Sequence, residues 1–325
     1  MSNRRNYGLD VYRILCCFGV LTYHVMDDIL GKTGASILYF MASYCVPGFF
    51  LLSGFLQGIR PTMTLDYVEG KIIGTMKKLF AWIILWSMLH FVNTGEIYDL
   101  WQQLTAGLVS GGILPVSWFL FTYCFLLFLV YPLWHLKNKY KKYFNIMAII
   151  WIILLAADVG RELIFIRTQS LWLHLYIGYF AFGMALTDIF AWIKKAQIRK
   201  ICIVIALNFL VITSAIYIYE ITHEEIYMAP HQYYGRWFYS LWLMSLFCLC
   251  ILIDIKNTAI QKVIKRIAGN TMVVYLGHLP ILIYITGIYP LQNTGEAIGC
   301  IIFLFVLLFT CAECMKKLPL LRKMV

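Results

Sequence analysis

Charged and polar residues lie in the first apolar segment of the sequence, where such residues are unexpected. Asp10, Arg13 and His24 fall inside this segment, and Asp27 and Asp28 close it. In a helix, the eleven residues from Arg13 to His24 make about three turns, so both side chains share one face, ~16 Å apart along the axis. Arg13 suits an anionic group, and His24 suits proton transfer because imidazole titrates near neutral pH.

Two interpretations of this pattern are open. Asp10 precedes Arg13 by one turn and is close enough to pair with it. In the first interpretation, the two residues are an interfacial ion pair and His24 is a hydrogen-bonding residue between helices. In the second, one polar face of the helix lines a channel that runs from Arg13 to His24. Charged residues within membrane helices are costly and usually functional.

Other polar residues also interrupt apolar segments. Ser53 belongs to the Pro- and Gly-containing stretch VPGFFLLSGF at 46–55, whose freed backbone groups a cavity or a neighbouring helix must satisfy. His278 precedes a proline by two residues, after Tyr275, and is an intramembrane polar site or a packing residue. Trp118 opens an apolar segment, where an aromatic belt residue is the simpler interpretation.

Two groups of charged residues flank the apolar segments. The first group lies on the side that the topology below assigns to the cytoplasm and consists of Arg60, Lys71, Lys77 and Lys78. The outer-side charged residues that could contact an acceptor or line a cavity are Arg161, Glu162 and Arg236.

The composition requires a membrane environment for the elements that carry these residues. The chain has 325 residues, of which 62% are hydrophobic and 13% charged, against about a quarter charged in soluble domains. A net charge of +11 would suggest nucleic acid in a soluble protein, but here the basic residues form short clusters between apolar runs. These clusters indicate membrane topology and contact with anionic lipid, and nucleic-acid binding is not expected.

The apolar runs predict an all-α, polytopic membrane bundle of about ten transmembrane helices. The predicted segments are 8–28, 36–57, 72–92, 114–135, 144–160, 171–190, 200–219, 236–254, 270–290 and 296–315. Basic clusters fall on alternate connections, so the positive-inside rule places both termini in the cytoplasm. We expect one domain over 1–325, without a separate soluble domain.

The ten cysteines mostly fall inside apolar segments, where a disulfide framework is not expected. No second Cys pair or cluster of His supports the spacing of Cys311 and Cys314 as a metal site. We therefore expect neither a metal nor a permanently bound cofactor.

Five motifs in order resemble the acyltransferase-3 family of membrane acyltransferases. They are the Arg-x10-His pair Arg13 and His24, the stretch 46–55, Trp118-Phe119-Leu120 with Tyr131-Pro132, Tyr179-Phe180-Ala181-Phe182-Gly183, and Tyr275-Leu276-Gly277-His278-Leu279-Pro280. Members often carry Arg-x-x-Arg where the third helix begins, whereas this chain has lysines. The resemblance therefore leaves open which of Lys71, Lys77 and Lys78 holds the donor.

The resemblance implies an acyl-CoA-dependent O-acyltransferase of the plasma membrane, in a bacterial cell. The co-substrate would be cytoplasmic acyl-CoA, by default acetyl-CoA. The acceptor would be a hydroxyl on an extracytoplasmic or membrane-borne molecule such as a cell-surface glycan or lipid-linked sugar. Membrane lipid is a further partner, and a homodimer remains open.

The implied roles follow the first helix. Arg13, with Asp10 and the lysines, would bind the donor beside Ser53. His24 would act as general base, or as an acyl-His nucleophile, with Asp27 or Asp28 orienting its ring. Trp118, Tyr275 and His278 would line the cavity. The alternative is a secondary transporter or membrane sensor that uses the same polar residues; a transporter would be expected to show an internal repeat, and none is detected.

Overall fold

All regular structure in the described part of the chain is helical. The computed structural model describes residues 5–27, 29, 33–95, 117–156, 173–193, 196–223, 237–319 and 321–324. The helices are α1 (Tyr7–Asp27), α2 (Thr33–Ala42), α3 (Cys45–Gly58), α4 (Leu65–Thr94), α6 (Ser117–Lys139), α7 (Lys141–Ala156), α9 (Leu173–Ile193), α10 (Ala196–His223), α11 (Trp237–Leu252), α12 (Thr258–Ala268), α13 (Thr271–Ile288), α14 (Thr294–Met315) and the short 3-10 helix η2 (Leu321–Met324).

The helices are those of a membrane protein. Six of the described helices are long and apolar enough to cross a bilayer: Tyr7–Asp27, Leu65–Val92, Ser117–Lys139, Ile198–Glu220, Thr271–Ile288 and Thr294–Met315. Three apolar helices are shorter, over Cys45–Gly58, Tyr176–Phe190 and Phe238–Leu252. Large apolar side chains cover the outside, with Val92, Phe128 and Ile288 at least 70% exposed, which suits lipid rather than water. The prediction of ten spans with cytoplasmic termini stays a prediction.

The predicted segment 36–57 is not one helix. It divides into α2 and α3 at a turn formed by Ser43 and Tyr44. Pro47 explains the break, because its nitrogen carries no hydrogen and cannot bond to the Ser43 carbonyl one turn back, whereas the first turn of a new helix tolerates proline. The Tyr44 hydroxyl donates to the Leu15 carbonyl at 2.7 Å, which ties the break to α1.

Two helical stretches extend beyond the predicted spans. α4 begins at Leu65 rather than at residue 72, because the Thr64 side chain accepts a hydrogen bond from the Tyr67 amide and caps the helix. α12 was not predicted, because it is amphipathic and too short to span a bilayer. Asn257 caps α12 by accepting from the amides of Ala259 and Ile260.

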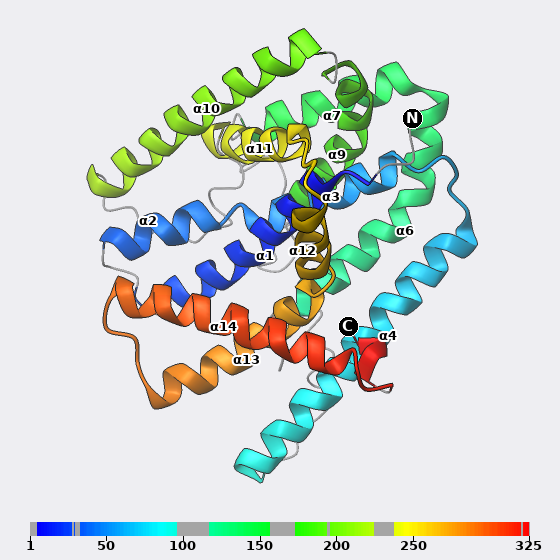
Figure 1. Cartoon of the computed structure of the whole chain (residues 1–325). Helices are drawn as coiled ribbons and strands as arrows, with labels where there is room; N and C mark the ends of the chain where they lie inside the picture. Colours follow the sequence, from blue (N-terminus) through cyan, green and yellow to red (C-terminus); the bar gives the residue numbers. More distant parts are fainter. Residues whose placement is uncertain are drawn as a thin grey trace.

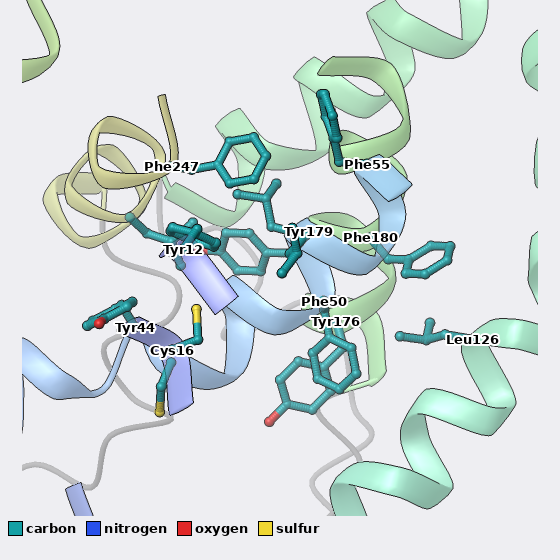
Figure 2. Packing of buried hydrophobic residues seen from close by; sticks show 14 of the residues in the cluster. Tyr12, Cys16, Tyr44, Phe50, Phe55, Leu126, Tyr176, Tyr179, Phe180 and Phe247 are labelled. Atoms are coloured by element: carbon teal, nitrogen blue, oxygen red, sulfur yellow. The ribbon is translucent and has the colours of Figure 1, made fainter. Parts of the chain in front are cut away.

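Helix α1 lies in the middle of the bundle. It packs against α2, α3, α11, α12, α13 and α14, and Figure 1 shows it between α2 and α14. Its own buried Tyr12 meets Phe247 of α11 edge-on, with ring centroids 5.0 Å apart (Figure 2). The helix that carries the Arg-x10-His pair is therefore held on most of its faces.

Helices α3 and α9 cross with their backbones in contact. A Cβ atom added to Gly54 would overlap the Phe180 carbonyl oxygen, and one added to Gly183 would overlap the Leu51 carbonyl oxygen. Gly54 and Gly58 have the Gly-x-x-x-Gly spacing that permits close approach of membrane helices. Figure 2 shows Phe50 of α3 beside Tyr176 of α9 near this crossing.

A buried lysine from α6 fastens one end of this crossing. The Lys137 ammonium donates to the Thr187 hydroxyl at 2.6 Å and to the Gly58 carbonyl at 3.3 Å. It lies 3.8 Å from the Asp188 carboxylate, which also pairs with Lys141 at 2.9 Å. The charge of Lys137 is thus compensated by α9, so the residue joins three helices.

Candidate active site

His24 and His278 lie side by side although they are far apart in the sequence. His24 is near the end of α1 and His278 is within α13, with ring centroids 5.2 Å apart and planes tilted by 41°. His278 is fully buried, whereas His24 is partly exposed. Tyr23 meets the His24 ring edge-on at 5.0 Å. A buried imidazole thus lies beside a more accessible one, and imidazole is a side chain suited to proton transfer.

The hydrogen bond of His278 assigns its tautomer. Nδ1 of His278 lies 2.6 Å from the Tyr275 carbonyl oxygen. A carbonyl oxygen only accepts, so Nδ1 must carry the hydrogen, and in the neutral ring Nε2 then presents a lone pair. Nε2 is buried and has no hydrogen-bond partner among the residues that the structure describes. Buried polar atoms are normally paired, so an unpaired one in a polar site indicates a role with a substrate or a moving proton.

A proline shapes the helix around His278. Pro280 cannot donate to the Leu276 carbonyl, which would otherwise be left open in the interior of α13. The indole nitrogen of Trp86 on α4 donates to this carbonyl at 3.3 Å. α4 therefore supplies the hydrogen bond that the proline removes, and it holds the segment that carries His278.

Trp86→Phe should lower the stability of the protein by about 1 kcal/mol, because a smaller aromatic ring replaces the indole and the donor to the Leu276 carbonyl is lost. The thermal midpoint of the detergent-solubilised protein measures this change. Trp192→Phe is the control, because Trp192 is 55% exposed on α9. Equal midpoints for the two variants would contradict the proposed role of the indole.

A row of aromatic rings leads from the histidine pair back toward Arg13. Tyr275 lies 5.9 Å from His278 and 5.1 Å from Phe119 of α6, measured between ring centroids. Phe119 is stacked with Tyr123 one turn along α6, with planes 4° apart. Tyr123 lies close enough to Arg13 for an electrostatic interaction. The row therefore joins, through α6 and α13, the two ends of the polar face of α1.

Arg13 is only weakly paired. Arg5 holds the Asp10 carboxylate with two hydrogen bonds, at 2.6 and 2.9 Å, and this contact raises the pKa of the Arg5 guanidinium. Arg13 lies 3.9 Å from the same carboxylate, with 32% of its side chain exposed. The predicted Asp10–Arg13 pair is thus present but long, because Arg5 forms the shorter, bidentate pair with the Asp10 carboxylate. Arg13 is left able to bind another anion.

The sequence matches a known protein family. The acyltransferase domain family matches residues 6–313, nearly the whole chain. This range contains both Arg13 and His278. The chain belongs to the acyltransferase-3 family. No curated protein and no solved structure showed a match to it. The family and the apolar helices together indicate a membrane acyltransferase.

The acyltransferase-3 motifs of this chain have physical roles in the fold. Gly54 of the second motif and Gly183 of the fourth form the α3–α9 crossing. Trp118 opens the third motif and contacts Tyr176 and Phe119, at centroid distances of 5.7 and 6.3 Å. The first and last motifs meet at the two histidines. Motifs that are distant in the sequence of the acyltransferase thus converge on one region around α1.

The structure separates the three lysines of α4. Lys71 and Lys78 lie near each other, and a helix places them on one face with the buried Thr75. Lys77 is exposed and is rotated by about 100° from Lys78. Ser53 lies on α3 and is partly exposed. The donor roles of all four residues stay predictions.

The remaining predicted residues are placed only in part. Asp27 is exposed at the last position of α1, and the described ring contacts of His24 are with Tyr23 and His278. Asp28, Arg161, Glu162 and Arg236 lie outside the described residues. Their roles in catalysis or acceptor binding therefore stay predictions.

Several residues of the site were missed from the sequence. Gln57 is a buried amide on α3, which accepts a hydrogen bond from the Tyr67 hydroxyl at 3.2 Å and lies near Tyr123. A glutamine at the end of an apolar segment was a signal that could have been used. Tyr67, Tyr123 and Trp86 carried no such signal, because aromatic residues occur throughout the chain.

Proposed function

We propose that the protein transfers an acyl group, by default acetyl, from acyl-CoA to a hydroxyl of an extracytoplasmic or membrane-borne acceptor. The observation that carries the proposal is the His24–His278 pair at one end of a row of rings that has Arg13 at its other end. Arg13 binds the anionic part of the donor, and its acyl thioester extends along α1 toward the histidines.

The transfer step uses the histidine pair as the base. His24 takes the proton of the acceptor hydroxyl as the oxygen attacks the thioester carbonyl carbon. The carbon–oxygen bond forms and the carbon–sulfur bond breaks, so the CoA thiolate leaves and the acceptor is acylated. Nε2 of His278 accepts a hydrogen bond from the protonated His24 ring, and His24 then gives the proton to the thiolate. Asp27 or Asp28 orients the ring of His24.

The topology that fits this step has ten membrane spans with both termini in the cytoplasm of a bacterial cell. Donor then enters at the Arg13 end of α1 from the cytoplasm, and acceptor reaches the His24 end from outside. Cell-surface glycans and lipid-linked sugars provide hydroxyls on that side. The whole chain acts as one acyltransferase unit.

The proposal is tested by the binding of acetyl-CoA to the purified protein in detergent, measured by calorimetry. Arg13→Ala should raise the dissociation constant at least tenfold, because a hydrogen bond to a charged group contributes about 1.5–3 kcal/mol. Arg322→Ala is the control, because Arg322 is exposed and distant in sequence from α1. A well-folded wild type that binds no acetyl-CoA would favour a transporter or a sensor with the fold of the family.

A further inference from the structure

Arg60 follows α3, and contacts from two other helices fix its side chain and its backbone. Its guanidinium lies over the ring of Tyr67, with Cζ 3.6 Å from the ring centroid. The indole nitrogen of Trp134 on α6 donates to the Arg60 carbonyl at 3.2 Å, which fixes the backbone. A cation over an aromatic face is stabilised by the ring and keeps its edge free for hydrogen bonds. Two helices, α4 and α6, therefore fix the direction in which this guanidinium points.

The guanidinium is incompletely satisfied. Nε of Arg60 is buried without a hydrogen-bond partner, and no carboxylate pairs with Arg60 within the part of the chain that the structure describes. A partly buried cation without a counter-charge is costly. Lys137, by contrast, has the Asp188 carboxylate 3.8 Å away as its counter-charge. Among the described residues, the guanidinium of Arg60 is therefore available to an added anion.

Arg60 and Arg13 belong to one continuous set of contacts. The Tyr67 hydroxyl, at the edge of the ring under Arg60, donates to Gln57. Gln57 and Arg13 both lie close enough to Tyr123 to influence its phenol. Two arginines from different segments thus flank a small polar cluster formed by α3, α4 and α6, at the Arg13 end of the row of rings.

We propose that Arg60, stacked on Tyr67, binds a phosphate group of the donor nucleotide, with Arg13 as the second cation of the same site. This inference rests on the proposed use of acyl-CoA and adds a residue that lies outside the five motifs. The planar fork of a guanidinium matches two phosphate oxygens, and the ring below it prevents the side chain from turning away. A lysine in this place offers a charge without the fork.

The test compares three ligands that differ in phosphate content: CoA, dephospho-CoA and pantetheine. Binding to the whole protein is measured by calorimetry in a maltoside detergent, which contains no phosphate. Arg60→Gln should weaken CoA binding by about tenfold or more and leave pantetheine binding unchanged. Arg60→Lys should recover part of the affinity. Arg322→Gln, which removes an exposed arginine, should bind all three ligands like the wild type.

The ligands identify the phosphate and separate the two proposals. An effect on CoA alone assigns Arg60 to the 3′-phosphate, and an equal effect on dephospho-CoA assigns it to the diphosphate; both support the inference. Unchanged CoA affinity in a folded Arg60→Gln variant overturns it, and added phosphatidylglycerol then shows whether a lipid phosphate is the anion instead. A wild type that binds no CoA overturns the proposed donor and this inference together.

Discussion

His24→Ala is expected to lower acyl transfer by about 10²–10⁴-fold, the usual contribution of a general base, without a change in expression or folding. The His24 ring lies at the end of α1 and is partly exposed, and its described contacts are with rings rather than with a structural hydrogen-bond network. Its removal should therefore affect chemistry more than packing. Transfer of radiolabelled acetyl from acetyl-CoA in membranes that contain the variant measures the loss.

Two further variants serve as a control for this experiment and as a test of whether the two histidines act together. His135→Ala removes an exposed histidine of α6 and should keep full activity. His278→Ala should also lower transfer, since it removes the acceptor Nε2 beside His24, and the loss in the double variant should be smaller than the product of the two single losses if the pair acts as a unit. Full activity of His24→Ala would exclude the proposed base.

Gly183→Ala is expected to destabilise the fold by about 3 kcal/mol, because the added methyl group overlaps the Leu51 carbonyl oxygen and crowds the Phe55 amide. Both neighbours are backbone atoms, so no side chain can move aside to accept the methyl group. α3 and α9 would have to separate along the whole crossing. The thermal midpoint in detergent and the recovery of monodisperse protein measure the effect.

The control for helix propensity is Gly299→Ala. Gly299 is exposed within α14, and a Cβ atom there would meet nothing within 4 Å. The same exchange should leave the midpoint of this variant unchanged or raised, since alanine favours helix more than glycine does. A Gly183→Ala variant as stable as Gly299→Ala would contradict the close contact between the backbones of α3 and α9.

The sequence predicted the helices better than their breaks. Long apolar runs gave α1, α4, α6, α10, α13 and α14, since the thickness of a bilayer sets the length of such runs. The division of 36–57 at Ser43 and Tyr44 depended on one missing amide hydrogen at Pro47, which hydropathy does not register. α12 was missed because an amphipathic helix has no spanning run.

For the site, the sequence predicted residues but not their neighbours. The spacing of Arg13 and His24 on one helix follows from geometry alone. The approach of His278 to His24 depends on the packing of α13 against α1, and the pairing of Asp10 with Arg5 depends on which arginine has the better geometry. Such choices are made by tertiary contacts, which a single sequence does not contain.

The crossing of α3 and α9 sets a limit on how the molecule can move. Two backbones in contact, locked by the glycines and by Lys137, have no layer of side chains that could be rearranged to let one helix slide past the other. Rocking of one half of the bundle against the other, as in transporters, would have to break this joint. A rigid crossing suits the proposed reaction, in which only the acyl group crosses the membrane while donor and acceptor stay on their own sides.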